Sequence, residues 1–338
     1  MSQTLASLLN EIWYSNHPAR WLLWPLALLF RAAVWIRRQL YQRGMLKSTE
    51  FDVPVIVVGN LSVGGTGKTP LVIWLARELR RRGLRVGVVT RGYRGKHLDW
   101  PERVNPDSDP AALGDEAVLL ARRTECPVVA GPDRVAAVAK LLAEVPLDLV
   151  LADDGLQHYR LARAFEIVVV DGERGLGNGL CLPAGPLREP PSRLRQVDAI
   201  VVNTGDWGHA GVFRGDLVPT RVVQLSSGTS KSLADFRGQP VHAVAGIGHP
   251  ARFFAMLDAH GLLVDPRPLT DHADMQATDL SFEDLAPVLV TEKDAVKCGS
   301  FAHERVWCVV ADFQFRDPDG QRFMRLVQRE LGAEAVAS

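Results

Sequence analysis

The chain has 338 residues, enough for two domains that each bury a hydrophobic core. Its 39 basic and 39 acidic residues balance, so no global charge indicates nucleic acid as a partner. The cysteines, none of them in a Cys-x-x-Cys pair, favour free thiols in a reducing compartment over disulfides or a zinc site. They are Cys126, Cys181, Cys298 and Cys308.

The N-terminal segment, residues 1–48, is apolar and basic. Leu5, Leu8 and Ile12 recur at the spacing of one helical face, and four of the eight tryptophans precede residue 36. Tryptophan favours the membrane–water interface, and arginine favours anionic headgroups. The segment therefore indicates membrane-associating helices.

The most apolar part of this segment, residues 21–36, would form a helix of about 24 Å. That length is shorter than the roughly 30 Å hydrocarbon core of a bilayer, and the stretch contains Arg31. No small-residue cleavage site follows, so we do not expect a signal peptide. We expect a peripheral or monotopic helix in the interface, with packing against the protein's own core as the alternative.

A glycine-rich turn follows the first predicted strand, residues 53–58. It reads Gly59-Asn-Leu-Ser-Val-Gly-Gly-Thr-Gly-Lys-Thr69, with Ser62 where such motifs usually have their first glycine. Glycines leave backbone N–H groups open to a polyphosphate, and the following helix points its positive end at it. We expect Lys68 to reach the β- and γ-phosphates of ATP and Thr69 to bind Mg²⁺. The predicted nucleotide-binding residues are Gly64, Gly65, Thr66, Gly67, Lys68 and Thr69.

Strands and helices alternate after residue 51, which predicts an α/β fold with a doubly wound, mostly parallel sheet of the P-loop kinase type. The predicted strands are 85–90, 127–130, 147–152, 166–170 and 198–202, and the predicted helices are 68–82, 115–123 and 134–144. A long connection, residues 92–114, is expected to be a lid or a disordered loop.

The predicted nucleotide-binding domain covers residues 49–222. A smaller C-terminal α/β domain is expected over residues 223–338. Its predicted strands are 239–245 and 287–291, and its predicted helices are 251–260 and 319–331.

Acidic side chains follow two of these elements. Asp153 and Asp154 end a strand, where P-loop proteins place an acid that holds Mg²⁺, and their alternation lets at most one face Thr69. Asp115 begins a helix after the long connection. It is either a helix cap or a general base that accepts the proton of a substrate hydroxyl.

Residues 171–191 are rich in glycine and proline around Arg174, Asn178, Arg188 and Glu189. Such a segment forms a shaped loop. Because it follows a strand, we expect it at the carboxyl edge of the sheet, where open α/β sheets bind ligands. The alternative is a domain linker.

Taken together, these segments resemble the tetraacyldisaccharide 4′-kinase family, the lipid A kinases of Gram-negative bacteria. The apolar N-terminus agrees with the family's membrane-associating segment. The resemblance rests on the glycine-rich turn, Arg91-Gly-Tyr93, Gly114-Asp-Glu116, Asp153-Asp-Gly-Leu-Gln-His158, Gly177-Asn-Gly179, Pro183-Ala-Gly-Pro-Leu-Arg-Glu-Pro190, Gly246-Ile-Gly248, Asp271-His272 and Thr291-Glu-Lys-Asp-Ala-Val-Lys297.

The resemblance implies a P-loop kinase that uses ATP and Mg²⁺ to phosphorylate the 4′-hydroxyl of a tetraacylated glucosamine disaccharide 1-phosphate, giving lipid IVA. It places the reaction at the cytoplasmic face of the inner membrane. From the residues themselves we expect no nucleic acid and no obligate protein partner. The family's base falls on Asp115 and its histidine partner on His272, and the metal and active-site carboxylates fall on Asp153 and Asp154. We further expect contacts to the acceptor from Glu116, Asn178 and Arg188.

This chain departs from the family at two positions. His249 stands where the family often has asparagine, and Ala273 where it often has a second histidine. Both positions lie next to segments of the resemblance, so the family's roles for them do not carry over directly.

Two other functions also fit a P-loop. Membrane-surface switch ATPases usually carry a second lysine beside the first loop glycine, where this chain has Val63. A soluble small-molecule kinase or ligase would leave residues 1–48 with a structural role only.

Overall fold

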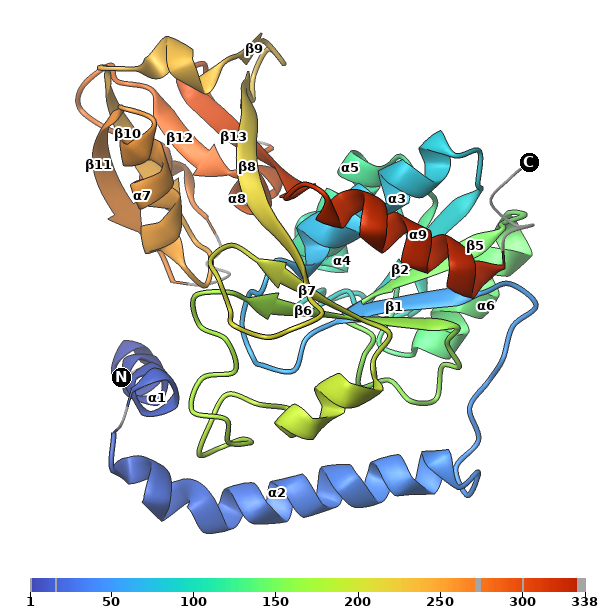
Figure 1. Ribbon diagram of the computed structural model, residues 1–338. Helices are drawn as coiled ribbons and strands as arrows, with labels where there is room; N and C mark the ends of the chain where they lie inside the picture. Colours follow the sequence, from blue (N-terminus) through green and yellow to red (C-terminus); the bar gives the residue numbers. More distant parts are fainter. Residues whose placement is uncertain (1, 16, 271–274, 300, 333–338) are drawn as a thin grey trace.

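The computed structural model describes residues 2–15, 17–270, 275–299 and 301–332 (Figure 1). Within these residues the strands form one sheet in the order β11-β10-β12-β13-β8-β7-β6-β1-β5-β2-β4-β3, with β9 beside β8. The strands are β1 (Val55–Gly59), β2 (Val86–Thr90), β3 (Glu102–Val104), β4 (Val128–Ala130), β5 (Leu149–Asp153), β6 (Phe165–Asp171), β7 (Ala199–Asn203), β8 (Phe213–Gln224), β9 (Ser230–Lys231), β10 (Pro240–Ala245), β11 (Leu263–Pro268), β12 (Val288–Thr291) and β13 (Val306–Phe315).

The α-helices and short 3₁₀ helices connect these strands. The α-helices are α1 (Ser2–Tyr14), α2 (Ala19–Gln42), α3 (Lys68–Arg81), α4 (Pro110–Leu113), α5 (Asp115–Thr124), α6 (Arg134–Glu144), α7 (Pro250–Ala259), α8 (Glu292–Ala295) and α9 (Asp319–Leu331). The 3₁₀ helices are η1 (Pro191–Gln196), η2 (Leu233–Phe236), η3 (Ala277–Leu280) and η4 (Val296–Cys298).

The sheet consists of two parallel blocks. The first block, β7-β6-β1-β5-β2-β4, and the second block, β13-β12-β10-β11, are joined by β8, which runs parallel to β7 and antiparallel to β13. Figure 1 shows β8 and β13 as the long strands that connect the two blocks. The predicted doubly wound, mostly parallel α/β fold is confirmed.

The first block is covered on both faces, which explains its continuous apolar strands. All five residues of β1 are buried, as are all five of β5. One core cluster joins the sheet to α3, α5 and α9, and a second joins it to α6 on the other face. Strands covered on both sides need apolar side chains at every position, and the sequence supplies them.

Helix α6 shows why its bounds could be predicted from nearby residues alone. Asp133 precedes it, and its carboxylate accepts hydrogen bonds from Val135 N and Ala136 N at 2.9 and 3.3 Å. An aspartate at this position satisfies N–H groups that have no partner within the helix. The helix spans the predicted residues 134–144.

The connection of residues 92–114 is not the disordered loop that was one of its two predicted forms, and the other form, a lid, stays a prediction. It contains β3, which pairs antiparallel with β4 at the edge of the sheet, and α4. The three residues of β3 and the four of α4 are too few for a periodic pattern to show in the sequence.

The predicted boundary at residue 222 falls inside β8, so the chain passes between the blocks as a continuous strand. Helix α9, assigned to the C-terminal half, packs on the first block, where Phe323 contacts Trp74. The division into two domains therefore stays a prediction, because one sheet runs through both blocks.

Helix α2 is longer than predicted. It continues from Ala19 to Gln42 through Pro25, and its 24 residues reach about 36 Å. The whole helix is therefore long enough to cross a bilayer, and the interfacial placement stays a prediction. Polar and basic residues near its end extend the helix without adding to the apolar run. Within the described part of the chain, α2 is the one helix with the length and composition to cross a membrane.

Most of α2 does not pack on the rest of the protein. Ala27 is its one buried residue, whereas Leu22 is 82% exposed and Leu29 69% exposed. Figure 1 shows the helix lying along the outside of the first block. Little of its apolar surface therefore serves the protein's own core, which argues against the alternative of a purely structural N-terminus.

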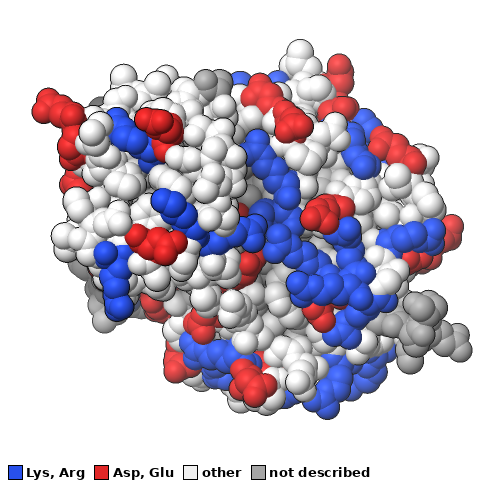
Figure 2. Space-filling model, turned by 90° about the horizontal axis from the view of Figure 1, so that it is seen from above, with Lys and Arg blue, Asp and Glu red and all other residues white. Residues whose placement is uncertain are grey.

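The charged side chains are not spread evenly. Seen from above, Lys and Arg gather across the middle of one face, with single acidic residues among them (Figure 2). This face is therefore locally basic, although the whole chain has 39 basic and 39 acidic residues.

Candidate active site

The glycine-rich turn leaves β1 and ends at α3, at the carboxyl edge of the first block. Gly67 has a φ of +87°, and a Cβ atom there would lie 2.2 Å from Asn203 Nδ2. Only glycine meets both conditions. Asn203 in turn donates to Thr66 O at 3.2 Å, so the end of β7 supports the turn from one side.

The segment 171–191 supports the turn from the other side. Val63 N donates to Pro186 O at 2.8 Å, and Arg188 N donates to Leu61 O at 2.6 Å. These backbone contacts place the segment against the glycine-rich turn, at the carboxyl edge where it was expected. It is part of the site's wall, which a linker between domains would not be.

Lys68 Nζ lies 3.4 Å from Asp154 Oδ1, and Arg188 Nη1 lies 3.2 Å from the same atom. Burial by itself raises the pKa of Asp154, but nearby cations, foremost Lys68 and Arg188, outweigh it and lower the pKa to about 2. Asp154 is therefore ionised. Its charge holds both cations at the place where phosphates are expected.

Asp153, one residue earlier, has a different environment. It is 1% exposed, Thr90 Oγ1 donates to its Oδ2 at 3.4 Å, and its Oδ1 has no hydrogen-bond partner among the described residues. Burial, with the negative charge of Glu116 next in importance, raises the pKa of Asp153 to about 7. A buried carboxylate with an unsatisfied oxygen fits the role of a cation ligand.

Asp115 and Glu116 meet two lysines from the second block. Lys297 Nζ lies 3.7 Å from Asp115 Oδ2, and Lys293 Nζ lies 3.0 Å from Glu116 Oε1. The lysines belong to η4 and α8, directly after β12. The acids at the start of α5 therefore link the two blocks at the site.

The structure also separates the two interpretations of Asp115. Gly114 occupies the N-cap position of α5, and no side chain caps it. Asp115 is 6% exposed, and its Oδ1 accepts a hydrogen bond from Glu116 N at 2.9 Å. The carboxylate is thus held in a defined orientation inside the site, and it does not serve as the N-cap of the helix.

Two further predicted site residues are His272 and Asn178. Residues 271–274, which include His272, lie outside the described part of the chain. The side-chain amide of Asn178 donates to Ile12 O and Ala184 O at 3.2 and 2.8 Å. The bond to Ile12 attaches α1 to the segment of residues 171–191, and the bond to Ala184 lies within that segment.

Several residues of the site were not singled out from the sequence. Thr90 and Asn203 end the parallel strands β2 and β7, so the strand-end rule that identified Asp153 would have found them. Arg134 is 2% exposed and donates to Asp153 O at 3.2 Å, and burial lowers its pKa to about 10. No local signal marks a buried arginine in a helix.

Comparison with known proteins agrees with this geometry. The family model described as tetraacyldisaccharide-1-P 4′-kinase (LpxK) matches residues 19–331. A tetraacyldisaccharide 4′-kinase of Nitrosococcus oceani is 51% identical over 324 residues, 96% of this chain and 95% of that protein. One of Alkalilimnicola ehrlichii is 52% identical over 306 residues, 87% of this chain and 91% of that protein.

A solved structure agrees as well. The LpxK of Aquifex aeolicus, determined in complex with ATP, superimposes with a TM-score of 0.78 at 28% sequence identity. The match covers 93% of this chain and 99% of that one. The chain therefore belongs to the tetraacyldisaccharide-1-P 4′-kinase family.

Proposed function

We propose that this protein transfers the γ-phosphate of ATP to the 4′-hydroxyl of a tetraacylated glucosamine disaccharide 1-phosphate, giving lipid IVA. The observation that carries the proposal is the meeting of a phosphate-binding turn with two separate carboxylate pairs at one edge of the sheet. Asp154 lies 3.4 Å from Lys68, and Asp115 lies 3.7 Å from Lys297. One pair serves the donor and the other serves the acceptor.

The donor half of the site consists of the turn and Lys68. The backbone amides of residues 64–69 and the Lys68 ammonium bind the phosphates of ATP. Arg188, held beside Lys68 by Asp154, adds a second cation at the same place. These charges stabilise the transition state, in which negative charge spreads over the transferred phosphoryl oxygens.

Mg²⁺ fits the residues present. Thr69 and Asp153 would hold it, because Asp153 Oδ1 is buried without a hydrogen-bond partner among the described residues. Asp154 is the second candidate, although Lys68 and Arg188 already contact its Oδ1. The bound cation would neutralise charge on the phosphates.

Asp115 is the proposed general base. It accepts the proton of the 4′-hydroxyl while that oxygen attacks the γ-phosphorus and the bond to the β-phosphate oxygen breaks. Glu116, the next residue of α5, is a proposed acceptor contact, and Arg188, which lies beside Asp154, is proposed to contact the acceptor as well as the phosphates. His272 is the proposed partner of Asp115 on the strength of the family resemblance alone.

Helix α2 is proposed to hold the enzyme at the cytoplasmic face of the inner membrane. Its exposed apolar side chains include Trp21, Leu22 and Leu29, and its basic residues suit anionic headgroups. The acylated acceptor resides in that membrane, so this contact brings the sugar to the site. The helix's length allows either interfacial or deeper placement.

The test uses purified full-length protein in detergent micelles, ATP, Mg²⁺ and tetraacyl disaccharide 1-phosphate. We expect one phosphate to be added at the 4′-position, identified by mass spectrometry of the product. Release of inorganic phosphate without lipid product would contradict the proposal and favour a switch ATPase. The comparisons do not favour that alternative, and Val63 stands where such ATPases carry a lysine.

A further inference from the structure

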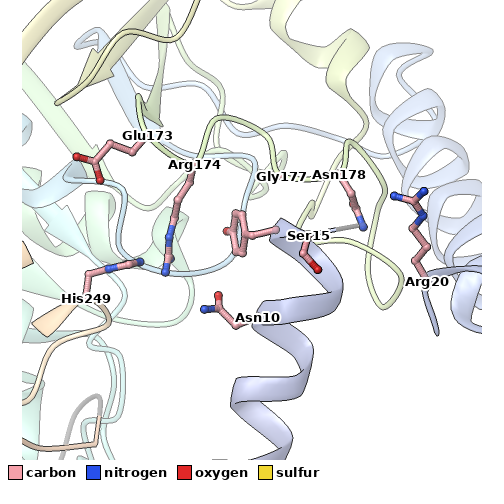
Figure 3. A pocket seen from close by; sticks show the side chains of 9 residues that line it. Asn10, Ser15, Arg20, Glu173, Arg174, Gly177, Asn178 and His249 are labelled. Carbon is pink, nitrogen blue, oxygen red and sulfur yellow. The ribbon is translucent and has the colours of Figure 1, made fainter. Parts of the chain in front are cut away.

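A pocket of about 560 Å³ lies beside the glycine-rich segment (Figure 3). It opens where α1, the start of α2, the loop after β6 and the residue before α7 come together. Figure 3 shows Arg174 and His249 on one side, Arg20 on the other side, Asn10 of α1 below, and Ser15, the residue after α1, between them. The proposed reaction uses none of these side chains.

The pocket carries an excess of positive charge. The Arg174 guanidinium lies 4.8 Å from the ring centre of Tyr14, and within the described residues it has no ion pair with a carboxylate. Glu173, the one acid in the lining, is held at 2.5 Å by Arg252. Arg252 also lies 3.0 Å from the buried Asp171. The negative charge of Glu173 is thus compensated by Arg252, and the positive charge of Arg174 is available to a ligand.

His249 adds an uncommitted polar atom. Its Nε2 is buried and has no hydrogen-bond partner among the described residues. Burial, followed by the charges of Arg174 and Arg252, lowers the pKa of His249, so the ring is neutral near pH 7. A neutral imidazole that carries its proton on Nε2 can donate to an anion, which would satisfy that atom.

We propose that this pocket binds a phosphate monoester on the sugar headgroup of the acceptor lipid. Arg174 supplies the charge, and His249 Nε2 supplies a hydrogen bond. A phosphate is the fitting anion because planar guanidinium groups match its oxygens, and because the pocket is large enough for a sugar ring as well.

The identity of the phosphate follows from the proposed function, on which this inference rests. The acceptor named by the family carries a phosphate at position 1, at the opposite end of the disaccharide from the 4′-hydroxyl. Asp171 ends β6, the neighbour of β1, and the three residues from there to Arg174 span at most about 10 Å. The pocket therefore lies next to a strand end at the same carboxyl edge of the sheet as the glycine-rich turn.

The decisive experiment compares Arg174→Met with the wild-type enzyme on two acceptors, with and without the 1-phosphate. For the phosphorylated acceptor we expect KM to rise about 10- to 100-fold, as for loss of a charge-assisted hydrogen bond. For the acceptor without the 1-phosphate, KM should be equal in the two enzymes. The KM for ATP should not change, and Arg174→Lys should recover part of the loss.

Arg195→Met is the matched control. Arg195 is exposed on η1, and its loss should leave both KM values unchanged. An equal rise in KM for both acceptors would overturn the proposal, because it would show that Arg174 only supports Tyr14 and α1. The proposal would also fail if Arg174→Met lowered binding to anionic phospholipid vesicles without discriminating between the acceptors.

A binding measurement separates this proposal from the kinase activity. Glucosamine 1-phosphate and glucosamine are titrated into the full-length protein, with saturation-transfer NMR as the readout. We expect a signal from the phosphorylated sugar alone, and its loss in Arg174→Met. If the protein made no lipid product yet showed this discrimination, the proposed function would fail and the pocket would stand. Equal signals from both sugars would overturn the pocket.

Discussion

Helices α2 and α3 carry similar apolar residues but turn them to different surroundings. α3 has 14 residues and buries six apolar side chains against the sheet. They are Leu71, Val72, Ile73, Leu75, Ala76 and Leu79. α2 has 24 residues and buries only Ala27. An apolar stripe therefore predicts a helix, but it does not tell which surface covers the stripe.

The difference separates two tasks. α3 uses its apolar face to fix Lys68 at the end of β1, so folding and phosphate binding depend on the same helix. α2 leaves large apolar side chains such as Leu22 in contact with solvent, and exposed patches of this kind mark surfaces that bind a membrane or another protein. Substitutions in α3 should therefore affect folding or chemistry, and substitutions in α2 should affect membrane binding.

The largest effect is expected at the start of α3. Lys68→Ala removes the cation proposed to bind the phosphates, so turnover should fall by at least about 10³-fold. The measurement is the initial rate of lipid phosphorylation at saturating acceptor. Lys140→Ala on α6, which breaks an ion pair with Glu102 of β3, is the control and should retain activity. Retained activity in Lys68→Ala would exclude the glycine-rich turn as the phosphate-binding part of the active site.

The next effect concerns the proposed base. Asp115→Asn keeps the shape of the side chain but not its capacity to accept a proton, so kcat should fall about 10²- to 10⁴-fold. The KM for ATP should stay within about twofold, since Asp115 is not expected to bind the donor. Asp107→Asn, at an exposed position of the same connection, should behave as wild type. Near-normal turnover would eliminate Asp115 as the base.

The core face of α3 predicts a purely structural effect. Leu75 is fully buried, and Leu75→Ala should lower the free energy of unfolding by about 2–5 kcal/mol. Chemical denaturation in detergent gives the measurement. The matched change Leu22→Ala in α2 should stay within about 0.5 kcal/mol. A similar loss in both variants would show that α2 packs on the protein after all.

Asp153 predicts a pH dependence that distinguishes stability from activity. Its pKa is raised to about 7, so the folded protein binds a proton that the unfolded chain releases near pH 4. Without ligands, wild-type stability should therefore fall as pH rises from 4 to 7 and then level off. Asp153→Asn removes this dependence and should be the more stable protein at pH 8, with equal stability near pH 4, while losing kinase activity. Thermal melts of both proteins from pH 4 to 8 give the comparison, and parallel curves would contradict the assigned burial effect.

The smallest effect on the fold is expected from the outer face of α2. Replacing Leu22 and Leu29 with serine should leave unfolding unchanged but weaken sedimentation with phospholipid vesicles by about 10-fold or more, since each buried leucine contributes roughly 1.5–3 kcal/mol. Unchanged vesicle binding would exclude this face as the membrane contact. A loss of lipid turnover without a loss of ATP binding would support it.

The sequence by itself determined the elements whose signals are local. The turn ending in Lys68-Thr69, the strand β1 before it, the helix α3 after it and α6 with its cap at Asp133 each depend on residues that are close to one another in the chain. Backbone geometry relates such residues directly, through helical spacing, strand alternation and glycine at positive φ. The rule that ligands lie at the carboxyl edge then placed Asp153 near the turn.

Only the tertiary structure decided which distant residues meet. It paired β8 with β13, brought Lys297 to Asp115, placed Arg174 beside His249, and showed that α2 continues to Gln42 with its apolar face outward. The two neighbouring carboxyl groups also differ in pKa. Burial raises the pKa of Asp153, whereas nearby cations, foremost Lys68, lower that of Asp154. Spacing along the chain carries no information on such contacts, because they depend on the order of the strands in the sheet and on how β8 joins the two blocks.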